Sequence, residues 1–195
     1  MKYNPDKHHR RSIRLKNYDY SQSGAYIITI CTQHKECLFG DVVDGDMVLN
    51  EYGRIVESEW LKTPHVRPYV ELDVFVVMPN HFHGILFIIK DEVSQMSDNT
   101  NSAHGRGMMH HAPTTNKREF SKPIANSLPA IVGGFKSIVT KRINRLRDTQ
   151  GGVLWQRNYY ETIIRNEHML NTRRQYIVSN PAKWANDENH PLNMK

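Results

Sequence analysis

Apolar residues fall into short segments along the chain, and the spacing within each segment predicts an element of secondary structure. β-Branched and aromatic residues cluster in segments that we expect to be strands, whereas apolar residues three or four positions apart indicate amphipathic helices. The expected strands cover residues 25–33, 70–78, 81–89 and part of 153–164, and the expected helices cover 52–61, 128–147 and 167–179. Residues 36–49 are rich in turn residues and are expected to hold a small hairpin.

The order of these segments predicts an α+β fold. Strand, helix, two strands, helix, strand and helix follow one another, which is the split β-α-β arrangement of a ferredoxin-like sandwich. We therefore expect an antiparallel four-stranded sheet with helices on one face and an added C-terminal helix. The segment 70–78 is apolar at most positions, so we expect it to lie in the centre of the sheet.

The length of 195 residues suits one domain with polar appendages. Residues 1–24 form an expected basic arm, 25–184 the domain, and 185–195 a C-terminal tail. Residues 90–127 show no periodicity and are expected to be a long flexible insertion. The histidines in it, His104, His110 and His111, fit a polar loop better than a metal site.

The formal net charge is +6, from 26 lysines and arginines against 20 acidic residues. The basic residues cluster at Arg10, Arg11 and Arg14 in the arm and at Lys136, Lys141 and Arg145 on the helix expected over 128–147. Clustering favours a polyanionic partner such as nucleic acid over a merely solvated surface.

The sequence contains few features that indicate a cellular compartment. No apolar run approaches the roughly 20 residues that a membrane span needs, and no apolar stretch typical of a secretory signal follows the charged N-terminus. Two cysteines, Cys31 and Cys37, are expected to be free thiols in a cytoplasmic protein.

Two histidines open the strand expected over 81–89, directly after a Pro79-Asn80 turn. Residues i and i+2 of a strand point to the same face, so His81 and His83 lie side by side while Phe82 faces the other way. Two neighbouring imidazoles can form half of a metal site. Taken alone, such a pair is more often a core or surface feature.

The last expected helix carries candidates for the rest of the site. Tyr176 and Asn180 are four residues apart and share one helix face, which could meet the histidines. Asn180 offers an amide oxygen as a third ligand, and Tyr176 offers a phenolic hydroxyl. Such donors suit Mg²⁺ or Mn²⁺ acting on phosphate, although histidine also suits Zn²⁺. The alternatives are that Asn-Pro only ends the helix and that Tyr176 packs in the core.

Several motifs together resemble the HUH single-tyrosine transposases, and most closely the REP-associated tyrosine transposases of bacteria. The motifs are Met-Pro-Asn-His-Phe-His-Gly at 78–84, Trp-Gln-Arg at 155–157, Ile-Arg-Asn at 164–166 and Tyr-Ile-Val-Ser-Asn-Pro at 176–181. Each is weak alone, but their order and spacing match over roughly residues 20–184.

The resemblance implies that His81 and His83 hold a divalent metal, that Asn180 completes the metal site and that Tyr176 is the nucleophile. It implies cleavage and rejoining of single-stranded or hairpin DNA through a 5′-phosphotyrosine intermediate, by a cytoplasmic protein associated with the nucleoid. Related enzymes pair the histidines of one subunit with the tyrosine of another, so both a homodimer and a monomer stay open.

Basic side chains are expected to contact the DNA backbone, and Trp155 to stack on unpaired bases. The expected backbone contacts are Arg10, Arg11, Arg14, Lys136, Lys141, Arg145 and Arg157. An alternative function is a non-catalytic domain that binds hairpin or single-stranded nucleic acid, with structural histidines. A hydrolase with a His-x-His-x-His motif is disfavoured because residue 85 is Ile.

Overall fold

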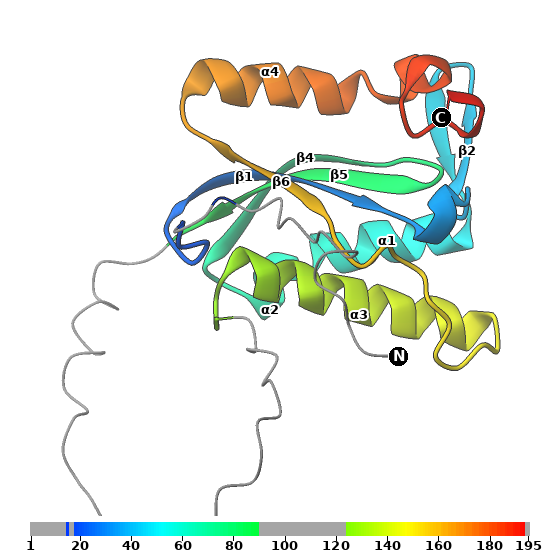
Figure 1. The fold of residues 1–195 in the computed structure, drawn as a ribbon, viewed down its shortest axis with the longest axis horizontal. Coiled ribbons are helices and arrows are strands. Elements are labelled where there is room, and N and C mark those ends of the chain that lie inside the picture. The colour runs from blue at the N-terminus through cyan, green and yellow to red at the C-terminus, as the bar shows by residue number, and fades with distance from the viewer. Residues whose placement is uncertain (1–14, 16–17, 90–123, 194–195) are drawn as a thin grey trace, which may run out of the picture.

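An antiparallel sheet of four strands forms the centre of the computed structural model, which describes residue 15 and residues 18–89 and 124–193. The strands lie in the order β4-β5-β1-β6 (Figure 1). They are β1 (Gly24–Cys31), β4 (Val70–Val77), β5 (His81–Ile88) and β6 (Tyr160–Ile164). With the helix after β1 and another after β5, this order is the ferredoxin-like arrangement expected from the sequence.

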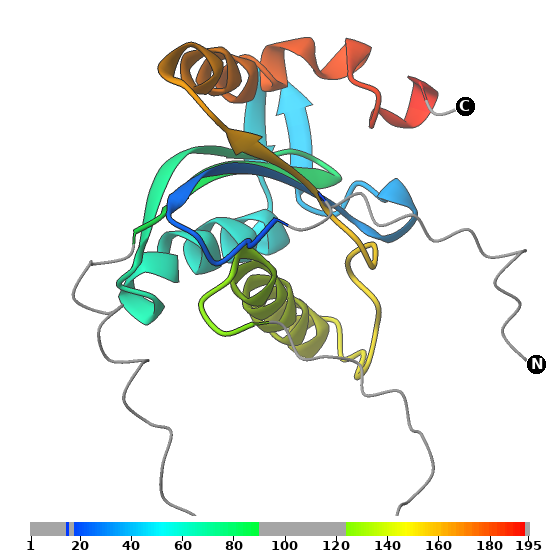
Figure 2. The same ribbon diagram turned by 60° about the vertical axis from the view of Figure 1, so that its left-hand side comes forward.

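Helices cover both faces of this sheet (Figures 1 and 2). One face carries α1 (Glu51–Leu61), the short α2 (Thr63–Val66) and the long α3 (Leu128–Leu146), whereas α4 (Glu167–Val178) lies on the opposite face. Side-chain caps fix the starts of two helices, since Asn50 accepts a hydrogen bond from the Gly53 amide and Asn166 one from the Met169 amide. None of the helices among the described residues has the length and apolar character to cross a membrane.

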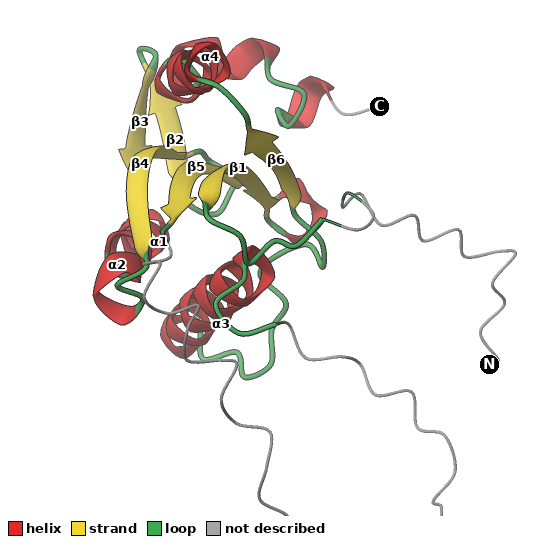
Figure 3. Cartoon of the chain, turned by 90° about the vertical axis from the view of Figure 1, so that its left-hand side faces the viewer, coloured by secondary structure: helices red, strands yellow, loops and turns green. Residues whose placement is uncertain are grey.

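A separate hairpin, β2 (Gly40–Val43) and β3 (Asp46–Leu49), stands at the end of the sheet beside the segment that follows α4 (Figure 3). Its two turn residues, Asp44 and Gly45, have φ values of 52° and 85°. Left-handed conformations at both central positions belong to a tight hairpin turn, and an Asp-Gly pair adopts them readily. The hairpin predicted within residues 36–49 is therefore present.

The strands alternate between two separate hydrophobic clusters. Phe82 and Leu86 of β5 belong to the large cluster between the sheet and α1 and α3, where Phe82 lies 4.8 Å from Trp60 and 5.4 Å from Phe135 between ring centroids. Ile85 belongs to a small cluster under α4 that also holds Ile177. The period of two along β5 therefore places the histidines on the α4 face and Phe82 on the opposite one.

Strand β4 lies at the edge of the sheet, and the prediction that it is central is wrong. Its apolar character has another cause, because α4 packs on one of its faces while α1 and α2 pack on the other. Coverage on both faces gives an edge strand the composition of a central one.

The chain after α4 is described through residue 193. It forms short 3-10 turns at Pro181–Asn186 and Pro191–Asn193, between which Asn189 is buried. Within the segment expected to be a tail, Asn189 contacts the domain, because its carbonyl oxygen accepts a hydrogen bond from Asn80, the residue before His81. The predicted arm contacts Arg10, Arg11 and Arg14, and His104, His110 and His111 of the insertion, lie outside the described residues.

Candidate metal and nucleophile site

The two histidines begin β5, and their side chains lie on the face covered by α4. His81 is paired with Cys31 of β1 and His83 with Thr29, so both backbone positions are fixed by the centre of the sheet. Both side chains are almost fully buried, with 0 % and 2 % exposure, and their ring centroids are 4.6 Å apart. The predicted pairing of the imidazoles on one face is present.

Asn80 holds the ring of His81 in one orientation. Its Nδ2 donates to the carbonyl oxygens of Lys35 (2.9 Å) and Asn189 (2.7 Å), so its Oδ1, 2.9 Å from His81 Nδ1, can only accept. The proton of His81 therefore sits on Nδ1, and Nε2 carries a free lone pair. Fixing the tautomer through the outer nitrogen is how proteins usually orient a metal-binding histidine.

His83 has a similar arrangement. Its Nδ1 is 2.7 Å from the hydroxyl of Thr29, and its Nε2 is 3.4 Å from the hydroxyl of Tyr176 on α4. Tyr176 is 39 % exposed, so this tyrosine lies between the buried histidines and solvent. The two histidines and the tyrosine, expected from the sequence to meet, therefore do so.

Buried acceptor atoms face one another around His81. Within the described chain, neither His81 Nε2 nor the Oδ1 of Asn180 has a hydrogen-bond donor, although both are buried. Asn180 lies close enough to His81 to favour the charged ring, as an amide oxygen beside a ring nitrogen does. Unpaired buried acceptors are costly, and either a proton or a cation between them removes that cost.

Burial disfavours protonation of the two histidine rings. Desolvation, followed by the charge of Lys35, lowers the pKa of His81 to about 3. Desolvation and the neighbouring His81 likewise lower the pKa of His83 to about 3. Both rings are therefore neutral near pH 7, which is the state that binds metal. The residues present fit a cation better than they fit a protonated histidine.

Asp187 completes the group and was not among the residues predicted from the sequence. One ligand atom each from His81, His83 and Asp187 lie within 4.8 Å of one another. Asn180 donates from Nδ2 to the Oδ2 of Asp187 at 3.4 Å, which turns the amide oxygen away from the carboxylate. Two imidazoles, a carboxylate and an amide oxygen form a mixed set that Mg²⁺, Mn²⁺ or Zn²⁺ can use.

No local sequence pattern pointed to Asp187, because it lies in an irregular segment whose position depends on tertiary contacts. Asn189 anchors that segment by accepting at its carbonyl from Asn80, and its backbone N–H donates to Asp187 Oδ1 at 2.6 Å. The ring of Trp184 lies 5.9 Å from that of His81. The one available signal was an acidic residue shortly after the Asn-Pro motif.

Tyr176 is protonated in this environment. Its pKa is raised, first by burial and then by the charges of Asp187 and Glu188, while Asn180 and Arg173 act in the opposite direction. A phenol must lose its proton to act as a nucleophile, so the site needs a positive charge near the Tyr176 oxygen to lower the pKa again.

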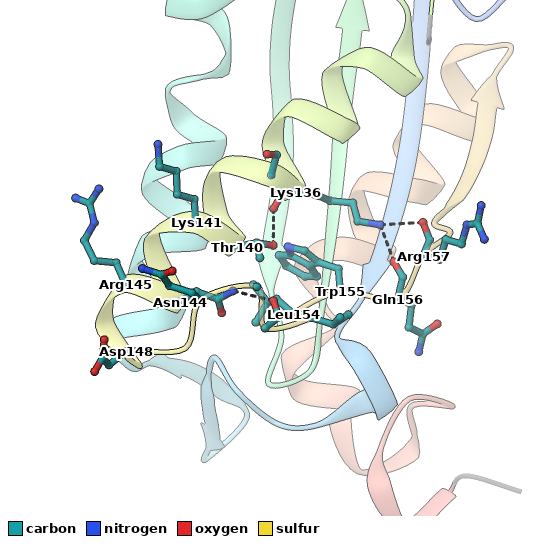
Figure 4. A pocket seen from close by; sticks show the side chains of 15 residues that line it. Lys136, Thr140, Lys141, Asn144, Arg145, Asp148, Leu154, Trp155, Gln156 and Arg157 are labelled. Carbon is teal, nitrogen blue, oxygen red and sulfur yellow. Dashed lines mark hydrogen bonds between the residues drawn. The ribbon is translucent and has the colours of Figure 1, made fainter. Parts of the chain in front are cut away.

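The predicted nucleic-acid contacts of the described chain lie elsewhere, in one groove beside α3. Lys136, Lys141, Arg145, Trp155 and Arg157 all line this groove, whose volume is about 830 Å³ (Figure 4). Because α3 covers the opposite face of the sheet from α4, the groove and the histidines lie on different faces.

Two of these residues have structural tasks. The Nζ of Lys136 donates to the carbonyl oxygens of Gln156 (2.6 Å) and Arg157 (3.2 Å), and burial lowers its pKa to about 8. Trp155 is 4 % exposed and packs against Phe39 and Phe135. The sequence predicts that Trp155 stacks on bases, but in the structure its ring packs against aromatic side chains of the core. Lys141, Arg145 and Arg157 are exposed.

No family model matches the chain. A protein of Haemophilus influenzae described as uncharacterized is 40 % identical over 187 residues, which are 96 % of this chain and 96 % of that protein. Among solved structures, the REP-associated tyrosine transposase bound to a REP hairpin has a TM-score of 0.53 at 16 % identity. That match covers 89 % of this chain and 73 % of the other, so the two share a fold.

Proposed function

We propose that this chain, which belongs to the same family as the Haemophilus influenzae protein and has the fold of the REP-associated tyrosine transposase, cleaves and rejoins DNA strands. The substrate is single-stranded or hairpin DNA, and the intermediate is a 5′-phosphotyrosine. That structural neighbour is bound to a REP hairpin, which supports this class of partner.

One observation carries the proposal: a tyrosine hydroxyl lies 3.4 Å from Nε2 of one of two neutral, buried histidines. Histidines with a purely structural role in the core would not need a partly exposed tyrosine, a carboxylate and an unpaired amide oxygen beside them. Together these groups suit phosphoryl transfer, because they would bring a nucleophile and a cation together at one phosphate.

The metal ligands in this proposal are His81 and His83, with Asp187, Asn180 or both. A divalent cation held by these residues would supply positive charge that stabilises the phosphate in the transition state and lowers the pKa of the Tyr176 phenol. Asn80 and Thr29 hold the two imidazoles through their Nδ1 atoms, so that both Nε2 atoms stay directed at the site.

Tyr176 performs the covalent step. Its oxygen attacks the scissile phosphorus in line, a P–O(Tyr) bond forms, and the bond to the 3′ oxygen of the departing strand breaks. The phenolic proton is lost and the departing strand gains a 3′ hydroxyl, so one phosphodiester replaces another. A 3′ hydroxyl then attacks the phosphotyrosine, restores a DNA phosphodiester and releases Tyr176.

The covalent adduct tests this proposal. The protein is incubated with Mn²⁺ and a hairpin oligonucleotide carrying single-stranded flanks, labelled at either its 5′ or its 3′ end, and then denatured. We expect the 3′ label to stay with the protein and the 5′ label to be released, because the downstream fragment is linked through its 5′ phosphate.

Tyr176→Phe should reduce adduct formation by on the order of a thousandfold or more, since the nucleophile itself is removed. Tyr160→Phe is the matched control, because Tyr160 is an exposed tyrosine on β6 and should leave the yield unchanged. An adduct that persists in Tyr176→Phe refutes the nucleophile assignment. Tight binding with no adduct in the unaltered protein indicates a binding domain instead.

A further inference from the structure

Two buried polar atoms in the wall of the groove beside α3 have no hydrogen-bond partner among the described residues. They are the Oδ1 of Asn144, an acceptor, and the Nε1 of Trp155, a donor. The side chains are 8 % and 4 % exposed, and both line the groove (Figure 4). A buried donor and a buried acceptor without partners in one cavity indicate a missing ligand.

The orientation of both groups is fixed by other contacts. Asn144 donates from Nδ2 to the carbonyl of Gly152 at 2.7 Å, which identifies the unpartnered atom as the oxygen. The backbone of Trp155 forms a bridge with Thr32 at the end of β1, and its ring packs against Phe39 at 5.2 Å. Neither side chain can turn to find a partner without giving up these contacts.

The mouth of the groove is positively charged. Lys141 and Arg145 on α3 and Arg157 on the facing segment are exposed and line it, against one acidic residue, Asp148. Three exposed cations around an opening favour a ligand that carries phosphate. The volume of about 830 Å³ lies within the range of small-molecule sites.

We propose that this groove binds one unpaired nucleotide. The edge of the base supplies a donor to Asn144 Oδ1 and an acceptor to Trp155 Nε1, and the phosphates lie at Lys141, Arg145 and Arg157. Every DNA base carries both a donor and an acceptor on its Watson–Crick edge, so the site selects an unpaired base before it selects its identity. In a duplex those edges are occupied by the pairing partner.

Entry of the base requires the loop over the groove floor to move. Both unpartnered atoms are fully covered, and the adjoining loop contains Gly151, with a φ of 77°, and Val153, which is 69 % exposed. Gly152 donates to the Thr149 carbonyl at 3.4 Å. Opening the loop also breaks the 2.7 Å hydrogen bond from Asn144 Nδ2 to the Gly152 carbonyl, so the incoming base must replace that acceptor as well.

The groove lies behind the catalytic end of the sheet. Gln156 donates to the carbonyl of Cys31, the residue of β1 that is paired with His81. An unpaired nucleotide held at the groove would thus sit at the same end of the sheet as the scissile phosphate. The inference rests on the proposed function in taking this nucleotide to be part of the DNA substrate.

Binding of two hairpins tests the inference by fluorescence anisotropy with the full chain. One hairpin is fully paired in its stem, and the other has the same stem with a single unpaired nucleotide. We expect the second to bind at least about tenfold tighter, a difference of about 1.4 kcal/mol. Equal affinity for the two hairpins overturns the inference.

Three variants locate that preference. Trp155→Phe removes the donor and keeps an aromatic ring, so it should reduce the preference about tenfold while affinity for the paired hairpin stays the same. Arg145→Gln should lower the slope of log affinity against log salt by about 0.7, as expected for one lost contact to single-stranded phosphate. Lys62→Gln, at an exposed lysine outside the groove, should change neither. A preference that survives in Trp155→Phe, or a salt slope that is unchanged in Arg145→Gln, overturns the inference.

Two further measurements separate the possible failures. Competition by millimolar deoxynucleoside monophosphate identifies a site that accepts a nucleotide alone, and its absence assigns the site to nucleotides within DNA. The covalent adduct is assayed in parallel at saturating oligonucleotide. An adduct without a preference for the unpaired nucleotide refutes the groove inference alone, whereas a preference without an adduct refutes the proposed function alone.

Discussion

The two faces of the sheet differ in what they bury. On the α1 and α3 face, strand β5 presents Phe82 and Leu86 to large apolar side chains. On the α4 face, the same strand presents His81 and His83, which lie beneath a smaller apolar cluster and the irregular C-terminal segment. One face therefore provides most of the stability, and the other tolerates unpaired polar groups that a cation would stabilise.

The largest effect is expected from substituting the phenylalanines on opposite faces of β5, because their losses in the free energy of unfolding should differ. Phe82 is fully buried beside Trp60 and Phe135, so Phe82→Ala should lower the free energy of unfolding by about 3–5 kcal/mol. Phe87 is half-buried on the α4 face, and Phe87→Ala should cost clearly less. Urea denaturation of both variants measures the two losses, and equal losses would contradict the division of labour between the faces.

Acidification should act on the α4 face. In the metal-free protein, burial lowers the pKa of both His81 and His83 to about 3, against an ordinary value of 6.5. Lys35 lowers the pKa of His81 further, whereas Asn180 raises it. Asp187 raises the pKa of His83. Below pH 6.5 the unfolded chain binds more protons than the folded one, so stability falls as the pH drops toward 3.

Each histidine contributes at most about 1.4 kcal/mol per pH unit in that range. Urea denaturation between pH 7 and 5 measures the slope, and His83→Leu should make it shallower. His65→Leu is the control, because His65 is exposed on α2. A slope that is the same in His83→Leu as in the unaltered protein would mean that His83 is not held neutral.

Local patterns accounted for the part of the site that lies on regular elements. The Pro79-Asn80 turn fixes where β5 begins, and the period of two then places His81 and His83 on one face. The Asn166 cap fixes the start of α4, which carries Tyr176 to the histidines. Turn chemistry and periodicity act over a few residues, so they can be predicted from a single sequence.

Features that depend on distant contacts could not be predicted in this way. The apolar pattern of 70–78 is the same for a central strand and for an edge strand covered by helices on both faces, so β4 was misplaced. The position of Asp187 depends on hydrogen bonds of its segment to Asn80 and Lys35, far away in the sequence. The packing of Trp155 could not be predicted either, because its aromatic partners, Phe39 and Phe135, lie in distant segments of the sequence.

The smallest expected effect concerns the third metal ligand on the α4 face. Substitution of Asp187 distinguishes a carboxylate ligand from an amide ligand. If Asp187 binds the cation directly, Asp187→Asn should weaken Mn²⁺ binding about tenfold, a loss of about 1.4 kcal/mol measured by isothermal titration calorimetry. His81→Ala should weaken it far more, since an entire buried ligand is lost. His65→Ala, which alters an exposed histidine, should leave Mn²⁺ affinity unchanged. If Asp187→Asn leaves Mn²⁺ affinity unchanged and Asn180→Ala weakens it, the amide of α4 is the third ligand, and the carboxylate acts only by orienting that amide through their hydrogen bond.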